Sequence, residues 1–275
     1  MRILIAGARG QLGRSLQALL GSQELTPLEH QQLDITDLEP VRQAIAAHHP
    51  DLVINAAAYN NVDGAESDAS GAYRLNALGP RNLALATAER QIPVLHVSSD
   101  YVFDGTSSEP YHEYHHTNPL SVYGSSKLAG ETAVAALNER HYIVRTAWLY
   151  HEIGGNFPNR MLQQKGRPEV RVVSDQSGSP TYAPHLANAI GRLVTTGAYG
   201  TYHFAGSGGT SFYELTLALY RHLEIDVPVI AVTTADFPRP AARPRYSVLT
   251  TLQTPEILLP PWEEGLEEYV RALKN

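Results

Sequence analysis

The sequence predicts an α/β fold, in which a doubly wound parallel sheet is followed by a smaller, irregular C-terminal lobe. Three observations support this prediction. Short apolar runs alternate with helical patterns over the first half, a glycine-rich turn follows the first run, and the alternation stops near residue 150. We therefore expect one domain over residues 1–150 and a second lobe over residues 151–275. Segments near 184–204 are expected to pack back onto the first domain.

Apolar periodicity places the elements of the first domain in order. The expected strands cover residues 2–6, 24–28, 51–55, 93–98 and 141–145. The expected helices cover residues 11–20, 37–48, 76–90 and 121–138. Because consecutive parallel strands need crossover connections, the helices should cover both faces of the sheet. In such folds ligands bind at the carboxyl ends of the strands.

The second half has a different pattern. Gly154, Gly155 and Pro158 interrupt the alternation, and loops rich in proline, serine and glycine recur after them. Helices are expected at residues 157–165, 184–196, 211–223 and 262–273. We expect this irregular lobe to close over the first domain.

Composition limits the function. The 275 residues carry a formal net charge of -7 and no cysteine. The acidic balance argues against nucleic acid or an anionic membrane as a partner, and the missing thiols exclude disulfides and thiolate chemistry. The sequence shows neither a signal peptide nor an apolar run of membrane-spanning length. We therefore expect a cytoplasmic enzyme with a small-molecule substrate, and a homodimer is compatible with the sequence.

The glycine turn predicts a dinucleotide site. Gly7, Gly10 and Gly13 follow the first expected strand and open the first expected helix, with the spacing G-x-x-G-x-x-G. Glycine is needed where the backbone turns sharply and where it approaches a pyrophosphate closely. The free amides and positive dipole of the helix N-terminus then attract the phosphates. This context makes the first domain a Rossmann-like dinucleotide-binding domain.

A tyrosine and a lysine on one expected helix point to catalysis. Tyr123 and Lys127 are four residues apart, so both side chains lie on one helix face. A neighbouring ammonium stabilises a phenolate and so lowers the tyrosine pKa. Ser99 ends an expected strand, where its hydroxyl can bond a substrate carbonyl and stabilise developing charge. We therefore expect Ser99, Tyr123 and Lys127 to form the catalytic group.

Longer motifs resemble one family. Together with the motifs above, they resemble the dTDP-4-dehydrorhamnose reductases, which belong to the extended short-chain dehydrogenase/reductase family. The matching segments are residues 96–105, 119–131, 145–150, 175–182 and 239–245. Related dehydratases place Asp-Glu after the catalytic hydroxyl residue, whereas Asp100-Tyr101 stands here, so dehydration is not expected.

The resemblance implies a nicotinamide cofactor, NADPH or NADH. The implied cofactor contacts are Gly7, Gly10, Gln11, Leu12, Gly13, Asp34, Ile35, Ala56, Ala57, Ala58, Tyr123 and Lys127. The choice of cofactor stays open. A carboxylate at Glu29 favours NADH, because it can bond the ribose hydroxyls, whereas the basic side chains of Arg9 and His30 favour a 2′-phosphate.

The resemblance also implies a reaction. Hydride transfer from NAD(P)H to the 4-keto group of dTDP-4-dehydro-6-deoxy-L-mannose would give dTDP-L-rhamnose, with Tyr123 as proton donor and Ser99 polarising the carbonyl. The implied substrate contacts are Asp100, Tyr101, Val102, Trp148, Asn156, Phe157, Arg239, Arg243 and Arg245. The three arginines form the local basic cluster that an acidic protein needs for a diphosphate. Two alternatives stay open: an epimerase or reductase of another nucleotide sugar, and a non-catalytic, NADP-binding regulatory subunit.

One motif suggests a metal but does not fit its context. Residues 112–116 match the zinc motif H-E-x-x-H, which requires a helix to bring both histidines to one metal. Pro110 and Pro119 bracket this stretch, which is too short for a dependable helix. We expect a solvated loop and no metal site, including at the first helix, where Arg14 and Ser15 replace the acidic ligand described for some relatives.

Overall fold

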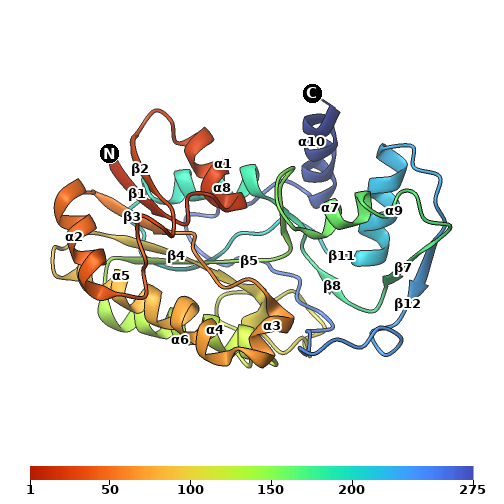
Figure 1. Ribbon diagram of the computed structural model, residues 1–275, viewed down its shortest axis with the longest axis horizontal. Coiled ribbons are helices and arrows are strands. Elements are labelled where there is room, and N and C mark those ends of the chain that lie inside the picture. Colours follow the sequence, from red (N-terminus) through yellow and green to blue (C-terminus); the bar gives the residue numbers. More distant parts are fainter. Residues whose placement is uncertain (275) are drawn as a thin grey trace.

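The computed structural model describes residues Met1–Lys274 and is built around a six-stranded parallel sheet (Figure 1). The strand order is β10-β5-β4-β3-β1-β2. The strands are β1 (Arg2–Ala6), β2 (Glu24–Leu28), β3 (Leu52–Asn55), β4 (Val94–Ser99), β5 (His141–Thr146) and β10 (Gly200–His203). The chain order reverses between β1 and β3, so the crevice at their carboxyl ends is where a ligand binds in such sheets.

Helices cover both faces of this sheet, which confirms the predicted fold class (Figure 1). One face carries α1 (Gln11–Leu19) and α8 (Ala183–Leu193), and the other carries α2 (Leu38–His48), α5 (Gly79–Ala88) and α6 (Val122–Leu137). Alternate residues of β1 face opposite sides, as strand geometry requires. Ile3 and Ile5 pack with α1 and α8, whereas Leu4 packs with α2 and α5.

The helix expected over residues 76–90 is observed as α5, and the stretch before it holds elements that were not predicted. This stretch contains α3 (Val62–Ser67), α4 (Ala69–Tyr73) and the π-helical turn η1 (Arg74–Leu78). Asn61 and Asp68 cap the two short helices by accepting hydrogen bonds from the amides three residues later. These helices are too short to show an apolar period, and they were not predicted. The capping residues Asn61 and Asp68 are the signal that could have indicated them.

The C-terminal lobe packs around its own cluster of aromatic and aliphatic side chains beside the sheet (Figure 1). It contains α7 (Phe157–Leu162), α9 (Phe212–His222), α10 (Trp262–Lys274) and the parallel pair of β7 (Val170–Val173) and β12 (Val229–Val232). The remaining short elements are two strand pairs and one turn: β6 (Leu149–Tyr150) with β9 (Thr181–Tyr182), β8 (Ser177–Gly178) with β11 (Thr210–Ser211), and the 3₁₀ turn η2 (Asp100–Val102). No helix among the described residues is long and apolar enough to cross a membrane.

Candidate active site

The turn after β1 has room for a phosphate because its glycines carry no side chains. Gly7 has a φ of +83°, and a Cβ there would lie 2.6 Å from the backbone nitrogen of Ala57. A Cβ on Gly13 would lie 2.4 Å from the carbonyl oxygen of Gly7. Gly10 precedes α1, and no side chain caps this helix. The free amides at the start of α1 therefore fit a dinucleotide pyrophosphate.

The loop opposite the glycine turn is held by Asn55. Its Oδ1 accepts a hydrogen bond from the Ala57 amide at 3.1 Å, and its Nδ2 lies 3.1 Å from Nδ1 of His96. This arrangement places Ala56 and Ala58 on the wall of the cleft. The backbone of Ala57 approaches Gly7, so small residues are needed here for close packing.

The predicted cofactor contacts Asp34 and Ile35 lie after β2. The Thr36 amide donates to Asp34 Oδ1 at 2.9 Å and holds the pKa of Asp34 below its usual value. The Ile35 side chain is buried beside Gly79, where a Cβ would lie 2.6 Å from its Cδ1 atom. Glu29 directly follows β2, and its carboxylate pairs with Arg9 of the glycine turn at 2.8 Å. The ion pair therefore joins Glu29, whose carboxylate favours NADH, to Arg9, whose charge favours the 2′-phosphate of NADPH.

We expect Glu29→Gln to shift cofactor preference toward NADPH. The change removes a negative charge that repels a 2′-phosphate, and it frees Arg9 to bind one. The ratio of kcat/KM for NADPH to kcat/KM for NADH should rise roughly tenfold, equivalent to ~1.4 kcal/mol. Glu24→Gln, at the opposite end of β2, is the matched control and should leave the ratio unchanged. An unchanged ratio of kcat/KM values in Glu29→Gln would show that Glu29 does not contact the cofactor ribose.

A cleft of about 640 Å³ lies between the carboxyl ends of the strands and the C-terminal lobe. The glycine turn and the loop after β3 contribute to it, and so do the end of β4, α6, α7 and α9. It brings together many of the predicted residues: Gly10, Gln11, Leu12, Ala56, Ala58, Ser99, Asp100, Tyr101, Tyr123, Lys127, Trp148, Asn156, Phe157, Arg239 and Arg243. One continuous cavity thus joins the expected cofactor and sugar sites.

Tyr123 and Lys127 lie one turn apart at the start of α6. Ser121 caps this helix by accepting a hydrogen bond from the Gly124 amide at 3.1 Å, which fixes the first turn. Burial raises the pKa of Tyr123 to about 12, although a hydrogen bond with Ser99 lowers it in part. Burial also lowers the pKa of Lys127 to about 8, against the opposing charge of Glu131. The pKa of Tyr123 is therefore raised by burial, and not lowered as expected from Lys127, so the side chain stays a protonated phenol, as a proton donor must be.

The hydroxyl of Ser99 is oriented by its neighbours. It donates to Oδ1 of Asp100 at 2.8 Å and accepts from the Tyr101 amide at 3.2 Å. Its proton therefore faces a carboxylate, whereas the sequence analysis expected it to face a substrate carbonyl. The hydroxyls of Ser98 and Thr146 line the same cleft and are buried without a hydrogen-bond partner. Such orphaned groups call for a ligand, and neither Ser98 nor Thr146 is among the site residues predicted from the sequence.

Three arginines surround the mouth of the cleft. Arg239 and Arg243 both bind the carboxylate of Asp63, with shortest distances of 2.7 and 3.0 Å. Burial alone would raise the pKa of Asp63, but these bonds and the Ala241 amide lower it to about 2. Arg160 projects from α7, and burial together with the charges of Arg239 and Arg243 lowers its pKa. Such a cluster of cations fits an anionic ligand.

The sequence analysis missed Arg160 and Asp63, because only the fold brings α7 and α3 to the same arginine segment. Two predicted substrate contacts do not line the cleft. Arg245 is exposed, with its carbonyl oxygen accepting from the Ser177 amide, so the chain turns its side chain to solvent. Val102 is fully buried with Phe103, because an apolar residue of η2 packs inward.

Aromatic rings form the wall beside the arginines. Trp148 stacks on Phe212 with ring centroids 3.6 Å apart, and Phe157 packs against the same ring. Trp148 has a φ of +45°, which is rare for a bulky residue and marks a site whose surroundings hold it. Gly178 permits this position, because a Cβ there would lie 2.4 Å from the indole. Asn156 caps α7 and donates to Gln11 Oε1 at 2.8 Å, which joins the lobe to the cofactor turn.

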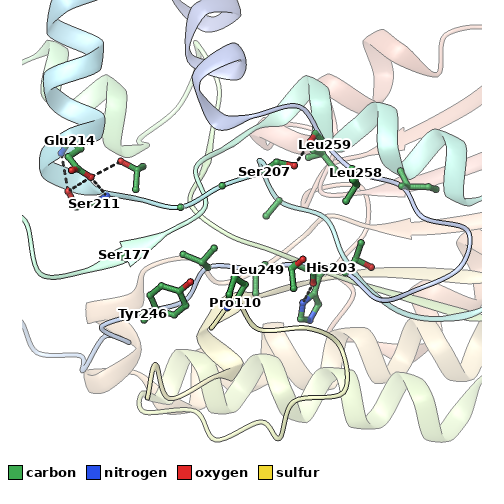
Figure 2. A pocket seen from close by; sticks show the side chains of 18 residues that line it. Pro110, Ser177, His203, Ser207, Ser211, Glu214, Tyr246, Leu249, Leu258 and Leu259 are labelled. Atoms are coloured by element: carbon green, nitrogen blue, oxygen red, sulfur yellow. Dashed lines mark hydrogen bonds between the residues drawn. The ribbon is translucent and has the colours of Figure 1, made fainter. Parts of the chain in front are cut away.

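A second pocket of about 530 Å³ lies within the C-terminal half (Figure 2). Figure 2 shows Ser207, Ser211 and Glu214 across the pocket from Ser177, Tyr246 and His203. It contains none of the glycine turn or the catalytic group. The first cleft therefore remains the candidate active site.

The H-E-x-x-H stretch forms a loop, as predicted. Glu113 turns inward and accepts hydrogen bonds from the amides of His203 and Leu252 at 2.9 and 3.0 Å. The His112 amide donates to Nδ1 of His115 at 2.9 Å. Within residues 1–274, no group of three or more acidic or histidine side chains is arranged to hold a metal.

Fold and cleft together define a nicotinamide-dependent oxidoreductase of the extended short-chain dehydrogenase/reductase type. The model of the RmlD substrate binding domain family matches residues 1–275, and the chain belongs to this family.

Named relatives agree with this assignment. The dTDP-4-dehydrorhamnose reductase of Aggregatibacter actinomycetemcomitans is 41% identical over 100% of this chain and 97% of its own length. The crystal structure of a dTDP-4-dehydrorhamnose reductase from Clostridium acetobutylicum matches with a TM-score of 0.97 and 42% identity over 100% of both chains. The Bacillus anthracis enzyme of the same name, in complex with NADP, matches with a TM-score of 0.96 and 39% identity over 98% of this chain and 99% of its own.

Proposed function

We propose that the protein reduces the 4-keto group of dTDP-4-dehydro-6-deoxy-L-mannose, giving dTDP-L-rhamnose. The main observation behind this proposal is that one cleft is lined both by Tyr123 and Lys127 and by the three arginines Arg160, Arg239 and Arg243. The first group suits carbonyl reduction, and the second suits a nucleotide diphosphate. The names of the family relatives support this substrate.

Tyr123 protonates the reacting oxygen. With its pyrophosphate held by the glycine turn, NADH or NADPH would supply the hydride when bound. As negative charge develops on the substrate oxygen, the protonated phenol of Tyr123 donates to it, so the free alkoxide does not accumulate. Lys127 donates to the carbonyl oxygen of Val97 at 2.6 Å, which fixes its ammonium beneath the cleft. This fixed charge favours the phenolate that forms when Tyr123 has lost its proton.

The arginines hold the diphosphate. Asp63 keeps Arg239 and Arg243 together and partly neutralised, and Arg160 supplies a third cation beside them. Planar guanidinium groups bind phosphate oxygens in pairs. Trp148 and Phe212 then form an apolar wall near the sugar. Anchoring at the phosphates therefore aligns the keto carbon with Tyr123.

We expect Arg243→Ala to raise the KM for the nucleotide sugar at least tenfold, with kcat within a few-fold of the wild-type value. Binding that is equal in the ground and transition states affects KM and not kcat. Steady-state kinetics at saturating cofactor measures both constants. Arg245→Ala is the control, because Arg245 is an exposed arginine two residues away that does not line the cleft. An equal rise in both variants would refute the phosphate role of Arg243.

The substrate assignment is tested by cofactor oxidation. Purified protein is mixed with NADH or NADPH and with dTDP-4-dehydro-6-deoxy-L-mannose generated in situ. We expect rapid, substrate-dependent oxidation and dTDP-L-rhamnose as the product. Oxidation only with a different keto sugar would reassign the substrate, and cofactor binding without any oxidation would favour a regulatory role.

We also propose that the enzyme acts in the cytoplasm on this nucleotide sugar, without nucleic acid as a partner. The net charge of -7 supports the second point, because it offers no general attraction for polyanions.

A further inference from the structure

A chain of hydrogen bonds connects the C-terminal lobe to the catalytic hydroxyl. The hydroxyl of Ser247 donates to Oδ2 of Asp100 at 2.7 Å. The other oxygen of this carboxylate, Oδ1, accepts from the hydroxyl of Ser99 at 2.8 Å. Ser247 and Asp100 are each only 1% exposed. Water therefore does not compete for these bonds, and each side chain constrains the next.

The backbone around Ser247 is fixed from both sides. The Ser177 amide donates to the Arg245 carbonyl oxygen, and the Ser247 amide donates to the Ser177 carbonyl oxygen, both at 2.8 Å. Tyr246 and Val248 line the second pocket, where Figure 2 shows Tyr246 and Ser177. The Ser247 side chain lies between them in sequence and points away from that pocket, toward Asp100.

The same segment also carries two of the cleft arginines. Arg239 and Arg243 stand at its start and bind Asp63, while Ser247 stands at its end and binds Asp100, and both carboxylates line the cleft. A ligand that binds the arginines therefore contacts the segment that also holds the catalytic serine in place.

We propose that Ser247 is a positioning residue, which orients Asp100 so that Asp100 fixes the hydroxyl of Ser99 beside Tyr123. This inference rests on the proposed function. Ser247 does not touch the reacting atoms, and it acts through two side chains in series. Through Ser247, the C-terminal lobe that binds the substrate phosphates also helps to position the hydroxyl of Ser99.

The arrangement requires Asp100 to be ionised, because only a carboxylate accepts from both hydroxyls at once. Burial raises the pKa of Asp100 to about 6, and the bonds from Ser247 and Ser99 lower it in part. The titratable groups facing Asp100 are Tyr101 and Tyr123, with Lys127 one turn further along α6. Loss of the Ser247 hydroxyl should raise this pKa, so the acid limb of the kcat profile should move to higher pH.

The test compares Ser247→Ala with the wild-type enzyme, with kcat and KM measured from about pH 5 to pH 9. We expect kcat at neutral pH to fall at least tenfold, the range of one hydrogen bond to a charged group. The KM for the nucleotide sugar should stay within twofold, and the acid limb should move upward. Ser179→Ala is the matched control, because it removes a buried serine hydroxyl that bonds the backbone of Gly208 and of Leu249, in the same segment as Ser247, but not Asp100. It should retain the wild-type profile.

A second measurement needs no turnover. The Asp100 carboxyl is titrated by ¹³C NMR in aspartate-labelled protein and assigned by its absence in Asp100→Asn. We expect its pKa to be higher in Ser247→Ala than in wild type. An unchanged Asp100 pKa, or an active wild-type enzyme whose kcat profile is the same in Ser247→Ala, would overturn the inference. A wild-type enzyme inactive on the sugar would contradict the proposed function instead, while the titration would still decide the role of Ser247.

Discussion

Replacement of Tyr123 by phenylalanine should abolish nearly all turnover while leaving cofactor binding intact. The buried phenol, whose pKa lies at about 12, is the group placed to protonate the substrate oxygen. General acid catalysis contributes typically about 10²- to 10⁴-fold, so kcat should fall by that factor. Fluorescence titration with NADPH or NADH should give a dissociation constant within a few-fold of wild type, because the glycine turn is unchanged.

Tyr220→Phe is the matched control for this loss. It also removes a phenolic hydroxyl, one that donates to the Met161 carbonyl oxygen within the C-terminal lobe. Its turnover should stay within about twofold of wild type. A Tyr123→Phe enzyme with turnover like that of Tyr220→Phe would exclude Tyr123 as the proton donor.

Removal of Arg145 should produce the largest loss of stability. Arg145 binds Glu131 through two nitrogens at 2.7 and 3.0 Å, and both side chains are less than a tenth exposed. Arg145→Leu would leave a buried, uncompensated carboxylate, which costs ~3–5 kcal/mol. Urea unfolding followed by circular dichroism measures the change in the free energy of unfolding.

Two further variants identify the cause of that loss. Arg42→Leu breaks an ion pair with Glu89 in which each side chain is 40% exposed, and it should lower the free energy of unfolding far less than Arg145→Leu. Replacing both Glu131 and Arg145 by leucine removes the unpaired charge, so the double variant should be more stable than Arg145→Leu alone. A double variant less stable than Arg145→Leu would show that packing, and not the buried charge, dominates.

The sequence predicted five of the six strands of the central sheet, most of them as apolar runs separated by helical patterns. The sixth strand, β10, was not predicted, because its residues Gly-Thr-Tyr-His form no apolar run. β7 and β12 were not predicted. Each has only four residues, and they pair across 55 residues of intervening sequence, so no local pattern indicates their partnership. The boundary at residue 150 and a homodimer stay predictions. β10 joins the main sheet and α8 packs on α1, so the second half of the chain contributes to both parts.

For the site residues too, the sequence indicates spacings within one element but not contacts between distant segments. Tyr123 and Lys127 were predicted as site residues because their spacing has a chemical meaning on one helix, and both line the cleft. Arg160, Asp63 and Ser247 were missed because their roles depend on residues that only the fold brings close. Asp63, for example, binds Arg243 across 180 residues.

The most direct test of the account is transfer of deuterium from the reduced cofactor to the sugar. The wild-type enzyme is incubated with dTDP-4-dehydro-6-deoxy-L-mannose and with NADPH or NADH deuterated at the transferred position. Mass spectrometry and NMR then locate the label in the product. The account predicts one deuterium on carbon 4 of dTDP-L-rhamnose for each cofactor oxidised. An unlabelled sugar product, or a changed sugar formed without net cofactor oxidation, would contradict it.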